Sequence, residues 1–204
     1  MNKKTRKVSV FDGVNMLPSF SEDGKKVAYC ASKGTGNCQI YYVEGNKVMQ
    51  ITDNKANNIS PTLSADAKKI YFCSDIKRVP SIYCVDREAQ TIERLTSDAS
   101  SMSPMYCAKR NSLAYCKKTD GVYQVFIYDC QEKEHRQVTF GGGHKSECSW
   151  SPCGNYILYA VEKDQKQYLE TVTILSGTIR RLTMKGNCSY PSWSQCYRQF
   201  PTLT

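Results

Sequence analysis

Three short signatures recur along this chain with nearly the same period, and they constrain its fold more than any other feature. The first is a proline, or a cysteine in one copy, that opens a short apolar segment; the intervals are 43, 43, 44 and 43 residues, at Pro18, Pro61, Pro104, Cys148 and Pro191. The second pairs an aliphatic residue with threonine, at Ile51-Thr52, Leu95-Thr96, Val138-Thr139 and Leu182-Thr183. The third lies between them, at Ile40-Tyr41, Ile82-Tyr83, Val125-Phe126 and Tyr168-Leu169. A period in the low forties built from short strands is typical of a β-propeller with one blade per repeat.

Within one repeat, turn residues separate four apolar segments. In the first copy the expected strands are 17–21, 26–31, 38–43 and 47–52, and Asp23-Gly24 supplies the tight turn between the first two. The second strand of each copy is almost continuously apolar, as expected where neighbouring blades cover both faces. The sequence therefore predicts an all-β β-propeller with four complete four-stranded blades, in repeats of about 17–52, 60–96, 103–139 and 147–183.

The two ends of the chain carry partial copies of the repeat. Residues 5–9 read as a last strand and residues 190–204 as a first strand with little after it. We therefore expect one partial propeller over 1–204, a fragment of a longer protein. Its open blade edges would expose apolar surface and favour self-association.

The charge distribution argues against a nucleic-acid role. The formal net charge is +9, but lysine and arginine are scattered over turns and strand ends, with one dense cluster at 3–7. No apolar run approaches the roughly 18 residues of a membrane helix. The basic start is not followed by the apolar core of a secretory signal, so the chain either stays in the cytoplasm or lacks its natural beginning.

Eleven cysteines need an explanation. Cys30, Cys73 and Cys116 occupy one position of the repeat, and Ala160 takes it in the fourth copy. A position that accepts cysteine or alanine requires a small, buried, apolar side chain. We therefore expect most cysteines to be free thiols.

The first repeat, from Pro18 through the closing Ile51-Thr52, carries a family resemblance. Its segments PSFSEDGKKVAY, QIY and QIT resemble the WD40-like repeat of the TolB family, PSFSPDGKKIAF followed by QIY and LT, and the other three copies match with decreasing fidelity. The resemblance implies a periplasmic module of the Tol-Pal envelope system whose propeller docks the lipoprotein Pal. The part of TolB that engages TolA has no counterpart here, and the abundant cysteine is unusual for an oxidising compartment.

Catalytic and metal motifs find no support in the sequence. There is no G-x-S-x-G nucleophile elbow, and the glycines at 141–143 precede no GK[ST]. His135 reads as a solvated residue of a polar turn. His144, Cys148 and Cys153 have a spacing that suggests zinc, but the repeat explains both cysteines: Cys148 replaces the proline and Cys153 the turn aspartate. We expect no catalytic residue, cofactor or metal.

Binding of a protein partner remains, and propellers usually bind where the blade connections and the second-to-third strand turns meet. The candidate partner-binding residues, all in blade connections, are Asn15, Met16, Asn58, Ile59, Ser101, Met102, His144, Lys145 and Asn187. The leading partner, by resemblance, is a Pal-like lipoprotein. Two alternatives stay open: a substrate-gating propeller separated from a prolyl-oligopeptidase-like serine hydrolase, and a cytosolic propeller scaffold.

Overall fold

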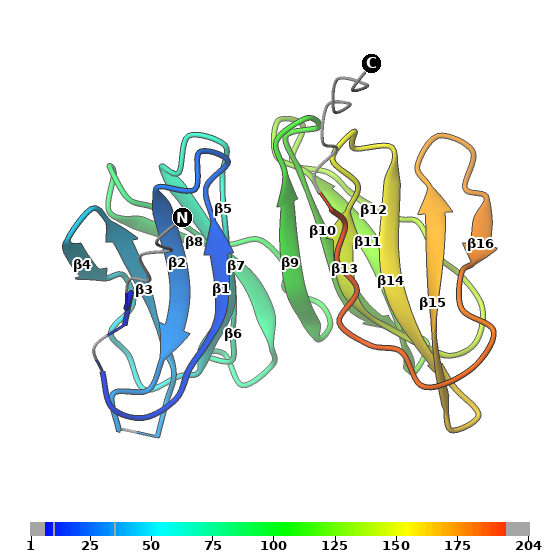
Figure 1. Cartoon of the computed structure of the whole chain (residues 1–204), viewed down its shortest axis with the longest axis horizontal. Helices are drawn as coiled ribbons and strands as arrows, with labels where there is room; N and C mark the ends of the chain where they lie inside the picture. Colours follow the sequence, from blue (N-terminus) through cyan, green and yellow to red (C-terminus); the bar gives the residue numbers. More distant parts are fainter. Residues whose placement is uncertain (1–6, 10, 35, 195–204) are drawn as a thin grey trace, which may run out of the picture. The chain divides into compact units, whose positions relative to one another are not determined.

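The computed structural model describes residues 7–9, 11–34 and 36–194, and this part of the chain contains strands and turns but no helix. Four antiparallel sheets of four strands follow one another, each with its strands in chain order (Figure 1). The strands are β1 (Asn15–Phe20), β2 (Lys26–Ala31), β3 (Gln39–Glu44) and β4 (Lys47–Gln50); β5 (Asn58–Leu63), β6 (Lys69–Ser74), β7 (Ser81–Asp86) and β8 (Thr91–Arg94); β9 (Ser101–Cys107), β10 (Ser112–Thr119), β11 (Val122–Asp129) and β12 (His135–Gln137); β13 (His144–Trp150), β14 (Tyr156–Lys163), β15 (Lys166–Thr173) and β16 (Ile179–Arg181). The predicted all-β fold of four four-stranded blades is confirmed. We number the sheets as blades 1 to 4.

The chain divides into two compact units at 104/105, inside β9. In the first unit, β5 of blade 2 lies against β1, β2 and β3 of blade 1. In the second, β13 of blade 4 lies against β10 and β11 of blade 3. The first strand of one blade thus packs on the inner strands of the blade before it. Described residues include no helix long and apolar enough to cross a membrane.

The core between blades 1 and 2 explains the apolar second and third strands. Ile40 and Tyr42 of β3 and Ile70 and Phe72 of β6 are among its fully buried side chains. On the opposite face of blade 1, Val8 and Phe11 pack against a second cluster, so this face is partly covered by the segment before β1. The described part of the expected strand 5–9, residues 7–9, is not strand; residues 5 and 6 lie outside the described part.

Each first strand is bent at its proline. The residue before the proline has a left-handed backbone, with φ 52° at Leu17, 53° at Ser60 and 55° at Ser103, and Glu147 has 58° before Cys148. The register of β1, β5 and β13 shifts at this point, which makes each a bulged strand. Proline suits a bulge because it has no N–H to place in the ladder.

The start of a fifth copy repeats this geometry at 190–194. Tyr190, before Pro191, has φ 51°. Trp193 Nε1 donates to the Ser149 carbonyl at 3.1 Å, as Trp150 Nε1 donates to the Met105 carbonyl at 3.0 Å. These described residues follow the path of a first strand, although they form no ladder; 195–204 lie outside the described part.

The strand pairing corrects the third signature in blade 4. Ala160 pairs with Leu169, just as Cys30 pairs with Ile40 and Cys73 with Ile82. Leu169, and not Tyr168, is therefore the counterpart of Ile40. A shift of one residue turns a side chain to the other face of a strand, so Tyr168 takes the place that Gln39 holds in blade 1.

The cysteine position of the repeat is buried, as predicted. Cys30, Cys73 and Cys116 are buried, and the ten described cysteines all have free thiols. Burial is the main cause that raises the pKa of Cys30 to about 11 and that of Cys73 to about 12. Cys116 faces the next first strand, where its Sγ lies 3.3 Å from Sγ of Cys148.

Candidate functional site

The end of each blade at which the second-to-third strand turn meets the outgoing connection is called the connection end below. In blade 1 it comprises residues 32–38 and 51–57, in blade 3 residues 120–121 and 138–143, and in blade 4 residues 164–165 and 182–188. The threonine of the second signature fixes the connection there. Its Oγ1 accepts a hydrogen bond from the third-strand N–H of Ile40, Ile82, Val125 or Leu169, at 2.8–2.9 Å, in the four blades.

A buried glutamine holds the connection of blade 1. Gln39 Nε2 donates to the carbonyls of Asn54 and Ala56, at 2.9 Å each. Its Oε1 accepts from the Asn54 N–H and from Asn58 Nδ2. Blade 3 repeats this with Gln124, which donates to the Gly141 carbonyl at 2.6 Å and accepts from Thr139 Oγ1. The polar side chains thereby satisfy backbone groups that the turn of the chain has taken out of water.

Three of the predicted partner-binding residues are also buried and form hydrogen bonds inside a blade connection. Asn58, Ser101 and Lys145 are 0%, 0% and 3% exposed. Ser101 Oγ donates to the Ala99 carbonyl at 3.1 Å, and Asn58 Nδ2 donates to Gln39 and to Asn54. In this structure these side chains face inward and bind their own connection.

Lys145 binds its connection with a charged group. Its Nζ donates to the carbonyls of Gly141, Gly142 and Gly143, at 3.3, 2.9 and 3.0 Å. Burial of the ammonium lowers the pKa of Lys145, and Lys163 acts in the same direction, whereas Glu170 opposes it. The glycine run that precedes β13 is therefore wrapped around a buried lysine, and it is not a phosphate loop.

The remaining predicted partner-binding residues differ in exposure and in their hydrogen bonds. His144 Nδ1 accepts from the Tyr123 N–H at 3.3 Å, and Asn187 Oδ1 accepts from the Gln167 N–H at 3.2 Å. Asn15 is exposed and donates to the carbonyls of Phe11 and Gly13. Met16 is exposed, whereas Ile59 and Met102 are half-buried, and Ile59 packs on the core of the first unit. Their role in partner binding remains a prediction.

Cavities open at the connection ends of blades 1, 3 and 4. Their volumes are about 350, 380 and 760 Å³. The lining residues of blade 1 include Lys33, Gln39, Tyr41, Asp53 and Lys55, and those of blade 3 include Asp120, Gln124, Gln137 and Phe140. Asn187 is the predicted residue that lines one of these three cavities.

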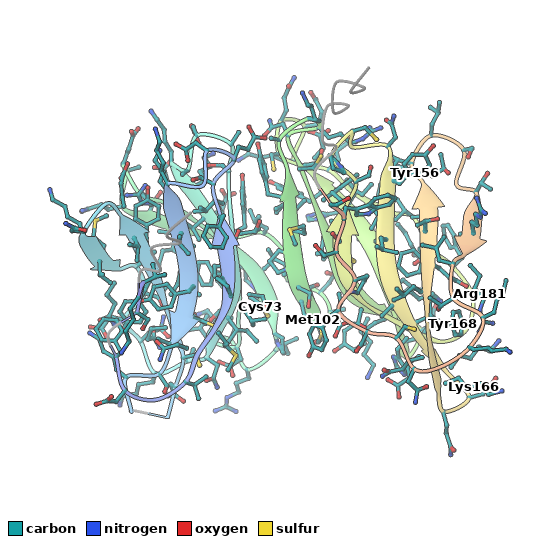
Figure 2. The ribbon with its side chains drawn as sticks, in the orientation of Figure 1. Cys73, Met102, Tyr156, Lys166, Tyr168 and Arg181 are labelled. Carbon is teal, nitrogen blue, oxygen red and sulfur yellow. The ribbon has the colours of Figure 1, made fainter. Side chains whose placement is uncertain are left out.

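The cavity of blade 4 differs in chemistry as well as in size. Lys163, Lys166, Arg181 and Lys185 line it together with one carboxylate, Asp164. Figure 2 shows Lys166, Tyr168 and Arg181 close to one another on β15 and β16. The guanidinium carbon of Arg181 lies 3.8 Å from the centroid of the Tyr168 ring. The sequence reasoning missed this group, although a repeat alignment that starts from the threonines would show Tyr168 in the place of a glutamine.

The two histidines are far from forming a catalytic or metal site. His135 begins β12 and does not lie in a turn; its Nδ1 is 2.9 Å from Tyr115 Oη, and its ring lies 4.7 Å from that of Tyr128. His144 binds the Tyr123 backbone, whereas Cys148 is buried beside Cys116. Over the described residues no three His, Cys, Asp or Glu side chains come together as a metal site would require.

Cys153 occupies the turn position of the aspartate, as the repeat predicted. Asp23 Oδ1 accepts from Ser21 Oγ at 2.6 Å, and Cys153 Sγ lies 3.3 Å from Ser151 Oγ. The hydrogen bond from Ser151 lowers the pKa of the Cys153 thiol. The thiol thus takes the place of the carboxylate beside the serine of the turn.

Solved structures share this fold. TolB from Acinetobacter baumannii matches with a TM-score of 0.73 at 21% identity, over 84% of this chain and 44% of that one. A putative TolB from Agrobacterium tumefaciens has the same TM-score at 18% identity, over 84% and 67%. A puromycin-hydrolysing peptidase of Mycobacterium tuberculosis matches with 0.71 at 15% identity, over 86% and 29%. None of the curated proteins matches the chain.

The chain therefore spans less than half of the Acinetobacter TolB and under a third of the peptidase. At these identities the likeness shows the fold. The family model described as the TolB beta propeller domain matches residues 1–197, nearly the whole sequence. Together with the four blades and their periodic threonine bonds, this match shows that the chain belongs to the TolB β-propeller family.

Proposed function

We propose that the chain is a non-enzymatic protein–protein interaction module that docks a Pal-like lipoprotein of the cell envelope at its connection ends. The observation that carries this is the set of three cavities at the same end of blades 1, 3 and 4, in a chain of the TolB family. Sites that bind a partner are concave surfaces on loops held by a rigid scaffold. The proposal places the protein in the periplasm, where Pal-like lipoproteins are found.

Phe140 is the side chain that tests the docking face most sharply. It lines the blade 3 cavity and is 68% exposed, and aromatic residues are enriched among interface hot spots. Leu175 is the matched control, since it is 96% exposed in the β15–β16 turn at the opposite end of blade 4. Both can be changed to serine with little effect on the core.

The experiment is isothermal titration of the purified full chain with the soluble domain of a Pal-like lipoprotein. We expect saturable binding that Phe140→Ser weakens by about tenfold, a typical hot-spot loss, and that Leu175→Ser leaves unchanged. Absence of binding by the wild-type chain, or an equal loss in both variants, would contradict the proposal.

A substrate-gating propeller of a serine hydrolase is the second candidate, and the fold similarity to the puromycin-hydrolysing peptidase favours it. Such a domain would act beside a separate catalytic domain. Adding the chain to that catalytic domain would then change its turnover of long peptides more than of short ones, because a gate selects by size. An equal effect on both would exclude gating.

A further inference from the structure

In the cavity of blade 4 several cations line a hollow of ligand size. Its volume is about 760 Å³, within the range of about 300–1,000 Å³ that is usual for ligand pockets. Four cationic side chains stand against one carboxylate. Ion pairs in the described residues join Lys26 to Glu44 and Lys68 to Glu88, both in the first unit. Among the described residues, none of the four cations of the blade 4 cavity forms an ion pair.

Arg181 is held in position by its neighbours. Its guanidinium stacks on the Tyr168 ring, 3.8 Å from the centroid, and its Nε donates to the Thr183 carbonyl at 2.9 Å. Stacking and one backbone bond fix the plane of the group, and Arg181 is one of the residues that line the cavity. A planar guanidinium fixed in this way is suited to a carboxylate, with which it forms paired hydrogen bonds.

The set of cations around this cavity is not repeated in the other blades. Counted from the threonine of each blade, Arg181 corresponds to Gln50, Arg94 and Gln137, and Lys185 corresponds to Asn54, Asp98 and Gly141. Arg94 of blade 2 donates to Ser81 Oγ of its own blade at 2.8 Å. In blade 1 the cavity holds Lys33 and Lys55 with Asp53, and Lys33 Nζ lies 4.4 Å from the Phe11 ring centroid. In blade 3 the charged lining residue is Asp120. The combination of an arginine two residues before the threonine with a lysine two residues after it thus occurs in blade 4 and in none of the other three blades.

We propose that the blade 4 cavity binds an acidic segment of the protein partner, with carboxylates paired to Arg181, Lys166 and Lys185. This rests on the proposed function and specifies the chemistry of the partner. The cations come from three segments, the β14–β15 hairpin, strand β16 and the outgoing connection. Because the cations are spread over three segments of the lining, a peptide with several carboxylates can pair with more of them than a single small anion can.

The test measures fluorescence anisotropy of a labelled hexaglutamate peptide on the full chain at about 50 and 150 mM salt, since screening weakens such pairs at higher salt. Arg181→Gln and Lys185→Asn install the residues of blade 1. Arg180→Gln is the control, because it removes the same charge from the same strand at a residue whose side chain points to the other face.

We expect Arg181→Gln with Lys185→Asn to weaken peptide binding by about tenfold, as the loss of paired charge-assisted bonds implies, and Arg180→Gln to change it less than twofold. Equal weakening by the control would show a diffuse charge effect and overturn the proposal. Displacement of the peptide by an equal concentration of inorganic phosphate would also overturn it, since the site would then be one for small anions.

Failure of this inference is distinguishable from failure of the proposed function. If the lipoprotein domain binds wild type and the Arg181→Gln, Lys185→Asn variant equally, docking stands and the acidic-segment site is wrong. If the substitutions in the cavity weaken hexaglutamate binding but the lipoprotein domain does not bind the wild-type chain, the acidic-segment site stands and the proposed partner is wrong.

Discussion

The connections that leave blades 1 and 4 follow the same path but are held by different side chains. In both, a threonine accepts from the third strand, Thr52 from Ile40 and Thr183 from Leu169. In blade 1 the carboxamides of Gln39 and Asn58 then bind the connection from inside. In blade 4 their places are taken by Tyr168 and Cys188, and the cavity has about twice the volume. The threonine sets the path, and the blade whose connection is bound by carboxamides has the smaller cavity.

Among the substitutions that test this comparison, we expect Gln39→Ala to lower the free energy of unfolding most. The substitution removes two donations and two acceptances inside the blade, and it leaves the carbonyls of Asn54 and Ala56 without their donor from Gln39. We expect a loss of about 3 kcal/mol in the free energy of unfolding, since buried groups left unsatisfied cost about 1–3 kcal/mol each. Urea unfolding followed by circular dichroism measures it.

Gln50→Ala is the matched control for Gln39→Ala. Gln50 is exposed and donates to the Thr52 carbonyl at 2.9 Å, so its loss should cost less than about 1 kcal/mol. If the two variants were equally stable, the buried network would not be what holds the connection of blade 1.

We expect the second-largest loss of stability for Lys145→Ala. Three glycine carbonyls lose their ammonium donor, and we expect a loss of about 2 kcal/mol, reduced because burying the charge is itself costly. Cys188→Ala changes the corresponding position of blade 4 and should stay within about 0.5 kcal/mol. Tryptophan fluorescence follows this unit, because Trp150 and Trp193 both lie in it. If Lys145→Ala left the free energy of unfolding unchanged, the three glycine carbonyls would accept hydrogen bonds from water in the variant.

The strands could be predicted from the sequence far better than the roles of the loop residues. The spacing of Pro18, Pro61 and Pro104 fixed where each blade begins, because bulge, buried strand and threonine bond all recur with the same period. Asn58 and Lys145, in contrast, are predicted as partner contacts because they lie in blade connections, where propellers usually bind their partners. The sequence does not show that a connection has buried carbonyls, and so it cannot show which polar side chains turn inward to bind them.

The candidate site was missed for a related reason. Aligning blade 4 by its apolar pair placed Tyr168 opposite Ile40, which hid its exchange with Gln39. The pairing of Ala160 with Leu169 corrects this register, and counting back from the threonines agrees, since Tyr168 and Gln124 both lie 15 residues before theirs. The basic residues around it are ordinary turn and edge lysines in the sequence, and the fold brings them to one cavity.

Restoring the blade 1 residues in blade 4 should have a smaller effect on stability. The variant Tyr168→Gln, Arg181→Gln, Cys188→Asn places carboxamides where Gln39, Gln50 and Asn58 lie in blade 1. We expect a gain of about 1 kcal/mol in the free energy of unfolding, the net worth of a hydrogen bond, together with loss of hexaglutamate binding. If the variant bound hexaglutamate as tightly as wild type does, these three residues would not determine binding in the cavity.

The smallest effect concerns the first turn of the same two blades, where blade 1 has Asp23 and blade 4 has Cys153. In blade 2, Asp66 Oδ1 accepts from Ser64 Oγ at 2.6 Å and from the Lys68 N–H at 3.0 Å, and the bond from Ser64 lowers the pKa of Asp66 below 3.8. Cys153→Asp should recreate these bonds and slightly raise the urea midpoint at neutral pH. A carboxyl whose pKa is lower in the folded chain adds stability above its unfolded pKa of about 3.9 and loses it as the pH falls through the folded value. The gain over wild type should therefore be complete at pH 6 and vanish near pH 2, whereas Cys153→Ser, the uncharged control, should show no such dependence. A gain that persists at pH 2 would show that removal of the thiol, and not a new carboxylate acceptor, stabilises the turn.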